Sequence, residues 1–235
     1  MENTLNEQKK NVFLEILNEF VSQDDLRPWM KSPFNAFDKT LATNGHVLIA
    51  TPKISEYIDY TDSKDGYFNT FSTLVIKHIY PVVHNIEKYY EVTSLKKALA
   101  KCPMLEEYDS IIHKCNACNG DGVVDYEFIH NGKTHIIEED CPICDGVGEI
   151  EKKSDKPNGK LHYDERKLIK LNDSTFSVLR IAEIIFVANK LNRGVITLVY
   201  NIGNKQPCLF KIDDLEMLVM PTYSDTDEHI IDNVF

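Results

Sequence analysis

The chain has 235 residues, of which 43% are hydrophobic and 27% charged, and its formal net charge is −11 at pH 7. This length and apolar content suffice for a packed core and exclude a disordered chain. The acidic balance argues against a protein that coats nucleic acid through its overall charge. No apolar run reaches the roughly 20 residues of a membrane span, and residues 1–8 lack the features of a secretory signal, so we expect a cytoplasmic protein without membrane contact.

The first hundred residues favour a mixture of helices and strands. Apolar residues at helical spacing predict an amphipathic helix over 3–22, and two strands about Asn44-Gly45 are expected within 34–52. Residues 54–73 are polar and irregular, and 74–90 fit a strand or a helix about Pro81. A short helix is predicted over 93–101, with Thr93 or Ser94 as its N-cap.

The most specific signal lies between residues 115 and 148, where the pattern C-x-x-C-x-G-x-G occurs twice. Two C-x-x-C pairs supply the four thiolates that tetrahedral Zn²⁺ requires, because each pair wraps the metal from one side. Glycine after a tight cysteine turn supplies a positive φ without a Cβ clash. We therefore predict one structural Zn²⁺ ion, with four ligands: Cys115, Cys118, Cys141 and Cys144.

A β-hairpin is predicted between the two cysteine pairs. Segments 123–130 and 133–140 have equal length and flank Asn131-Gly132, a strong signal for a two-residue turn. This register places Gly122 opposite Cys141, with acidic residues mainly on one face. The other face carries Val124, Tyr126, Phe128, His135 and Ile137. Such an apolar face either packs onto the rest of the protein or binds a partner.

Two alternatives to zinc were weighed, a disulfide pair and a redox C-x-x-C motif. Disulfides are rare in the reducing compartment expected here, and a thioredoxin-type motif is not duplicated with flanking glycines. Zinc is therefore the preferred interpretation. Cys102 and Cys208 stand in apolar surroundings and are interpreted as small core residues.

The two stretches CNACNGDG and CPICDGVG resemble the repeats of the DnaJ-type cysteine-rich zinc finger. Members of that family carry four repeats and two zinc centres, so two repeats imply a single centre. The chain has no His-Pro-Asp, the signature of the J domain. The resemblance thus implies a zinc centre and the binding of protein segments, rather than stimulation of an Hsp70 chaperone.

The last seventy residues predict an ordered β-α-β-β-β unit. A strand over 168–171 is followed by helix caps within 173–177 and a mostly buried helix over 178–192 that ends at Gly194. Three strands follow, with turns at Gly203-Asn204 and Asp213-Asp214: 195–200, 207–212 and 215–221. Residues 224–235 form an acidic tail with an apolar end, for which fraying is favoured over a docking peptide.

This final unit, closing on LEMLVMPTY, resembles the closing half-domain of the bacterial sliding clamp, the β subunit of replicative DNA polymerase. LATNGHVLIA at 41–50 is similar to the clamp hairpin Ala-Thr-Asp-Gly-His-Arg-Leu, with Asn44 replacing the Asp and Val47 the Arg. Clamps line a DNA channel with basic helix residues and close a ring from several subunits. The resemblance therefore implies homo-oligomerisation and a DNA-facing set: Lys96, Lys97, Lys101, Arg180, Lys190 and Arg193. Ordinary solvated helix faces explain the same residues.

Together these signals predict an α+β fold of antiparallel sheets with packed helices, made of clamp-like β-α-β-β-β units and an inserted zinc-binding hairpin. The expected parts are 1–113 and 151–223 for the body, 114–150 for the hairpin and 224–235 for the tail. Because no phosphate loop, dinucleotide motif or nucleophile elbow occurs and four cysteines fill the zinc shell, we expect a non-enzymatic protein. Its partner is either DNA or replication proteins, as for a clamp-like scaffold, or protein segments, as for a chaperone-like module.

Overall fold

The computed structural model describes residues 2–22, 30–36, 38–59, 85–203, 206–224 and 227–234. Most of the stretch 54–90 and the turn at Asn204 lie outside these ranges, so the expectations for them stay predictions. The chain divides into two compact units. The first, here called the body, comprises Met1–Pro103 and Tyr163–Phe235, and the second, here called the ribbon, comprises Met104–His162.

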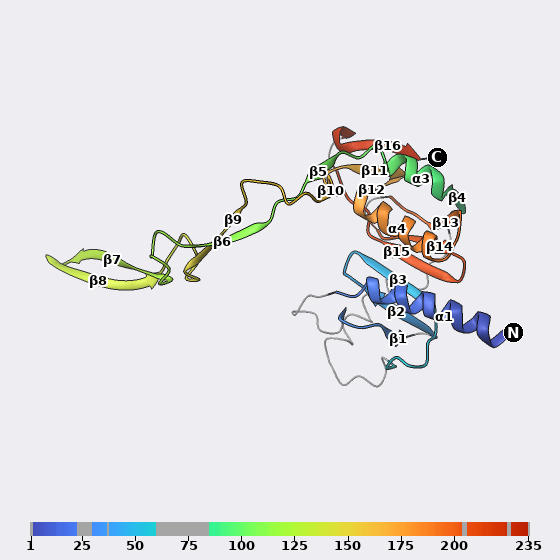
Figure 1. Ribbon diagram of the computed structural model, residues 1–235, viewed down its shortest axis with the longest axis horizontal. Coiled ribbons are helices and arrows are strands. Elements are labelled where there is room, and N and C mark those ends of the chain that lie inside the picture. The colour runs from blue at the N-terminus through green and yellow to red at the C-terminus, as the bar shows by residue number, and fades with distance from the viewer. Residues whose placement is uncertain are drawn as a thin grey trace. The chain divides into compact units, whose positions relative to one another are not determined.

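A seven-stranded antiparallel sheet forms the centre of the body, in the order β1-β2-β3-β15-β14-β13-β4 (Figure 1). It consists of two three-stranded meanders that pair through their last strands, plus β4 (Lys88–Glu91) at one edge. The first meander contains β1 (Phe34–Ala36), β2 (Lys39–Thr43) and β3 (Val47–Pro52). The second contains β13 (Val195–Tyr200), β14 (Cys208–Ile212) and β15 (Leu215–Val219).

Three α-helices are present among the described residues. α1 (Glu2–Glu19) precedes the first meander and α4 (Val178–Lys190) precedes the second, so each half of the sheet follows a helix. α3 (Val92–Leu99) follows β4 directly and packs against α4. The predicted antiparallel α+β class is therefore confirmed, and the body contains two successive α-β-β-β halves.

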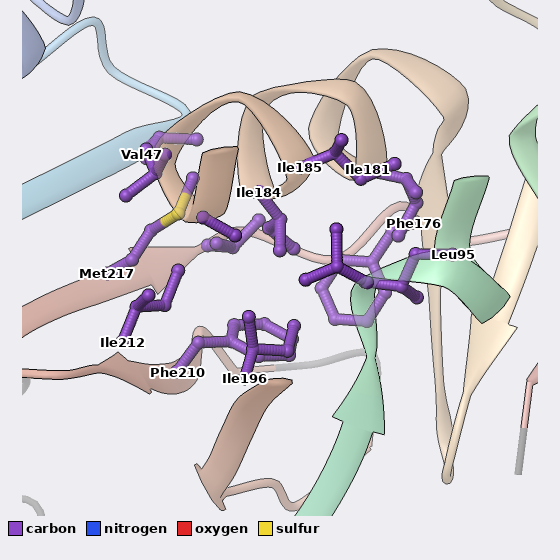
Figure 2. Packing of buried hydrophobic residues seen from close by; sticks show 14 of the residues in the cluster. Val47, Leu95, Phe176, Ile181, Ile184, Ile185, Ile196, Phe210, Ile212 and Met217 are labelled. Carbon is purple, nitrogen blue, oxygen red and sulfur yellow. The ribbon is translucent and has the colours of Figure 1, made fainter. Parts of the chain in front are cut away.

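The main core lies between the helices and one face of this sheet (Figure 2). Ile181 and Ile184 of α4 are fully buried beside Phe210 of β14 and Met217 of β15. Both isolated cysteines, Cys102 and Cys208, are buried in this core as predicted. Alternate residues of the same strands form a second buried cluster: Phe34, Leu41, Leu48, Ala50, Val199, Leu209 and Leu218. Burial of both faces explains why Val47–Ala50 is continuously apolar.

Several predictions for the helix caps were wrong. Ser174–Ser177, predicted as caps, forms strand β12, which pairs with β11 (Leu168–Leu171) across a turn in which Asn172 has a φ of 53°. Ser177 alone caps α4, and α3 begins after Glu91 without a side-chain cap. α4 ends at Lys190 because Asn192, with a φ of 52°, takes the left-handed conformation before Gly194.

Two further corrections concern strand pairing. The acidic tail does not fray: Ile230–Val234 forms β16, which pairs in parallel with β11. Next to the junction with the ribbon, β10 (Leu161–Tyr163) pairs with β5 (Met104–Glu106). In the first meander, the expected single strand is split into β1 and β2 near Asp38, whose φ is 58°.

The ribbon consists of paired strands interrupted by the two cysteine motifs. β6 (Ser110–Lys114) pairs with β9 (Glu149–Lys153), and β7 (Val123–His130) pairs with β8 (Lys133–Asp140). The β7–β8 turn has positive φ at both Asn131 and Gly132, as a type I′ turn requires. The predicted hairpin and its register are therefore confirmed.

The chain leaves the body and returns to it at one hydrogen-bonded point. The backbone N–H of Asp164 donates to the carbonyl oxygen of Pro103 at 3.0 Å, and the Cys102 thiol contacts the Asp164 carbonyl. Arg166 donates two hydrogen bonds to the Asp164 carboxylate, at 2.8 and 2.9 Å, and lowers its pKa to about 2. This junction fixes both ends of the insertion.

Candidate metal centre

The four predicted ligands come together in the ribbon. The Sγ atoms of Cys115, Cys118, Cys141 and Cys144 all lie within 4.8 Å of one another. Two contacts join the motifs, Cys115 Sγ to Cys141 Sγ at 3.9 Å and Cys118 Sγ to Cys144 Sγ at 3.7 Å. Zinc–sulfur bonds of about 2.3 Å in a tetrahedron place the sulfurs about 3.8 Å apart. The spacing therefore fits a four-coordinate Zn²⁺ ion.

Each cysteine motif forms the same tight loop. The N–H of Gly120 donates to the carbonyl of Cys115 at 3.0 Å, and Gly146 donates to that of Cys141 at 3.2 Å. A second amide in each loop points at sulfur: Gly122 N lies 3.3 Å from Cys118 Sγ, and Gly148 N lies 3.2 Å from Cys144 Sγ. Such amides stabilise thiolates, the form that binds metal.

The two loops are also locked to each other. Cys115 N–H donates to the carbonyl of Gly148 at 2.8 Å, and Cys141 N–H donates to that of Gly122 at 2.7 Å. A Cβ atom on Gly122 would lie 2.3 Å from the Gly146 oxygen, and one on Gly148 would lie 2.5 Å from the Gly120 oxygen. Gly122 and Gly148 therefore allow the two loops to approach each other closely. This role is additional to the positive φ that the sequence predicts.

Sequence reasoning missed the residues that precede the first glycine of each motif. Asn119 has a φ of 54° and Asp145 a φ of 49°. Asn and Asp tolerate the left-handed conformation better than other non-glycine residues. Asn119 and Asp145 occupy the same position in the two repeats. This repetition in the sequence could have predicted a left-handed residue before the first glycine of each motif.

All four cysteines of the cluster are buried. All four are at most 8% exposed, and no cysteine of the chain is in a disulfide. Burial raises the pKa of Cys144 to about 12. Burial also opposes ionisation of Cys118, but the amides of Gly122 and Gly120 outweigh it and lower its pKa to about 7. Four sulfurs this close cannot all ionise unless a cation balances them, which a divalent metal does.

The six basic residues named for DNA contact all lie in the body. Lys96 and Lys97 are exposed on α3, and Lys96 donates to the side-chain oxygen of Asn189 on α4 at 2.8 Å. The other four are ion-paired: Lys101 with Asp232, Arg180 with Glu183, Lys190 with Glu15 and Arg193 with Asp213. A DNA phosphate would have to compete with these carboxylates for the four ion-paired basic residues.

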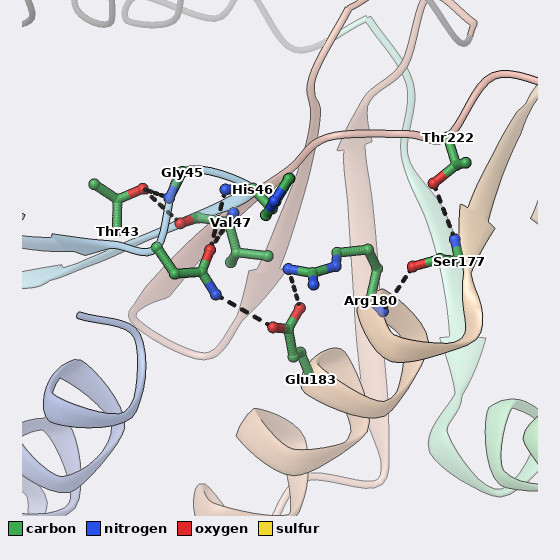
Figure 3. Close-up of polar contacts among 9 residues, drawn as sticks. Thr43, Gly45, His46, Val47, Ser177, Arg180, Glu183 and Thr222 are labelled. Carbon is green, nitrogen blue, oxygen red and sulfur yellow. Dashed lines mark hydrogen bonds and ion pairs between the residues drawn. The ribbon is translucent and has the colours of Figure 1, made fainter. Parts of the chain in front are cut away.

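Asn44, at the turn of the clamp-like stretch, connects the sheet to α4 through Glu183. Figure 3 shows Glu183 and its contact with Arg180 on α4. The side-chain oxygen of Asn44 accepts from the amides of His46 and Val47, at 3.0 and 2.9 Å. Its side-chain nitrogen donates to Glu183 at 3.3 Å, and Glu183 lies 2.9 Å from Arg180. Burial raises the pKa of Glu183. Arg180 is thus held in a largely buried polar network rather than presented to solvent.

Comparison with protein families and curated proteins gives no match for this chain. Solved structures with similarity include bacterial sliding clamps. A clamp from Pseudomonas aeruginosa has 13% identity and a TM-score of 0.43, covering 91% of this chain and 64% of the clamp. The DNA polymerase III subunit beta of Bartonella birtlesii, bound to griselimycin, has 9% identity and a TM-score of 0.45, covering 92% and 64%. Caulobacter crescentus pol III beta has 9% identity and a TM-score of 0.44, covering 92% and 65%.

The chain thus spans less than two thirds of the length of these clamps. Separately, no helix in the described part of the chain has the length and apolarity to span a membrane.

Proposed function

We propose that the protein is a non-enzymatic scaffold whose ribbon is held by one structural Zn²⁺ ion. The close approach of the four buried sulfurs, which all lie within 4.8 Å of one another, carries this proposal. Four thiolate ligands leave no coordination position for a water or substrate, so the metal has a structural role. The ion joins the two loops and thereby sets where β7 begins and where β8 ends.

Metal analysis of the purified protein tests the zinc centre. We expect one Zn²⁺ per chain, lost on Cys118→Ser and kept on Cys208→Ser, which replaces an equally buried cysteine outside the cluster. A chelator should unfold the ribbon, because roughly 10 kcal/mol of folding free energy can depend on such a site. Purified protein without bound metal, with all thiols titratable, would refute the proposal.

For the body we propose a clamp-like scaffold that contacts DNA or replication proteins and assembles as a homo-oligomer. The two stretches that resemble clamps, 41–50 and 215–223, include β3 and β15, which pair at the centre of the sheet. Each meander that ends in one of these strands follows a helix. The exposed lysines of α3 would provide the first contacts with phosphate.

Salt-dependent retention on DNA tests this role. We expect Lys96→Glu with Lys97→Glu to weaken retention, because both side chains are exposed and helical, whereas Arg180 is held by Glu183. Lys133→Glu with Lys152→Glu, in the ribbon, is the control with the same change in net charge. Equal loss in both variants would show non-specific attraction, and no retention at low salt would exclude DNA as the partner.

A second candidate function is a protein-binding module of the DnaJ type. It is favoured by the exposure of large apolar residues on the ribbon, among them Tyr126, Phe128 and Ile137. A chain that binds peptides but not DNA at low salt would support this function over the clamp-like one.

A further inference from the structure

The β7–β8 hairpin has unusually little support from other strands. It is a two-stranded sheet, and within the described residues no third strand pairs with either edge. Except for Val123 and Val124, all its strand residues are exposed. A hairpin of two strands is marginally stable alone, and exposed edges of this kind pair readily with another chain.

One face of the hairpin is apolar. The register aligns Tyr126 with Ile137 and Phe128 with His135, so these four side chains lie together. The rings of Phe128 and His135 stack with centroids 5.2 Å apart and an interplanar angle of 17°. Tyr126, Phe128 and Ile137 remain 43–46% exposed. Exposed apolar surface therefore lies beside the edge of β7, where a bound segment could cover it.

The opposite face of the hairpin is acidic. Asp125 of β7 lies directly across from Glu138 of β8, and like charges in that position destabilise a hairpin. This face carries four acidic residues, Asp125, Glu127, Glu138 and Asp140, beside the exposed Ile129 and Ile136, whereas Glu139 lies across from Val124 on the other face. A basic partner would relieve this repulsion.

The middle of β7 alternates between the two kinds of side chain. Its sequence from Val124 to Phe128 is apolar, acidic, apolar, acidic, apolar, so the apolar and acidic groups point to opposite faces. A strand added at this edge has the same period of two. An added strand that alternates in step with β7 would place apolar residues beside Tyr126 and Phe128, and basic residues beside Asp125 and Glu127.

We infer that β7 is a docking edge for an extended protein segment in which apolar and basic residues alternate. The segment adds to the ribbon as a third strand, with main-chain hydrogen bonds for affinity and the two faces for specificity. A second copy of this chain is disfavoured because its own β7 would oppose Asp125 and Glu127 with like charges. This inference rests on the proposed zinc centre, which holds the start of β7 in place.

The test uses the full zinc-loaded chain and a fluorescent peptide of alternating Val and Lys, as long as β7, followed by anisotropy. Two control peptides are needed, one with the same residues in blocks and one with Glu in place of Lys. We expect only the alternating Val-Lys peptide to bind, more weakly as salt is raised. Its binding should slow amide hydrogen exchange in β7, which contact through side chains alone would not do.

Variants then separate edge docking from general charge attraction. Asp125→Lys with Glu127→Lys should weaken binding of the Val-Lys peptide about tenfold and confer binding of the Val-Glu peptide. The matched control is Glu149→Lys with Glu151→Lys on β9, which makes the same charge change and should leave binding unchanged. Tyr126→Ser with Phe128→Ser should abolish binding.

Several outcomes would overturn the inference: no binding at low salt, equal binding of the blocked peptide, equal loss with the β9 variant, or dimerisation through β7. Zinc content is measured for every variant. If the parent chain holds one Zn²⁺ ion but binds no peptide, only the docking edge is contradicted. If the parent chain holds no Zn²⁺, the proposed metal centre is contradicted.

Discussion

Gly122 and Gly148 determine how closely the two cysteine loops approach. Both have positive φ, and each faces a backbone oxygen of the opposite loop at a distance where no Cβ fits. Backbone atoms cannot move aside as a flexible side chain can. An alanine here would therefore separate the loops and enlarge the sulfur cage.

We expect Gly122→Ala to destabilise the zinc-bound ribbon by about 3 kcal/mol, through backbone strain and the clash together. That corresponds to roughly a hundredfold weaker zinc binding, measured by competition with a chromophoric chelator. Gly132→Ala is the matched control, since Gly132 also has positive φ but no atom within 4 Å of its missing Cβ. Equal weakening in both variants would show that φ alone matters.

At the scale of elements, the β2–β3 turn is tied to α4 by a single polar side chain. Asn44 accepts from two turn amides and donates to Glu183, so its amide serves the sheet and the helix together. A carboxylate at this position would still accept from the turn but would face Glu183, which is itself partly buried.

We therefore expect Asn44→Asp to lower the free energy of unfolding by about 1–3 kcal/mol at neutral pH. Adding Glu183→Gln should restore much of the loss, because the amide can donate to the new carboxylate. Urea denaturation of both single variants and the double variant gives the coupling between the residues. Strictly additive effects would contradict the proposed contact.

Elements encoded by local pattern were predictable from the sequence. Asn131-Gly132 between two equal segments specified the β7–β8 hairpin, and the repeated cysteine motif specified which four side chains meet. α1 and α4 followed from their apolar spacing. The close approach at Gly122 and Gly148 was not predictable, because it depends on how two separate loops face each other.

Elements that depend on distant partners were missed. β16 is a strand because β11 offers it a parallel edge about sixty residues away, and no local pattern encodes that pairing. β12 contains two serines and a threonine, whose preference for caps and turns was overridden by pairing with β11. The sequence also could not show that four of the six basic residues have carboxylate partners.

At the scale of the whole molecule, the C-terminal segment completes the body. β16 pairs with β11, Val234 is buried, and Asp232 is ion-paired with Lys101 at 2.9 Å. A chain ending at Ser224 should therefore lose about 3 kcal/mol of stability, from the burial of Val234 and the partly buried Ile231.

Thermal or urea unfolding of the body measures this loss. Asn233→Ala is the control, since Asn233 lies in the same strand but is exposed and should leave the transition unchanged. A truncated chain that unfolds at the same midpoint as the full chain would show that β16 is dispensable.

The hydrogen bond between Asp164 and Pro103 has a consequence for how the chain responds to loss of metal. Because the ends of the insertion are already held together within the body, a melted ribbon becomes a closed loop whose entropy cost grows only with the logarithm of its length. We therefore expect the body to keep its fold when the ribbon unfolds. For the same reason we expect the body to accept segments of very different length between these two residues.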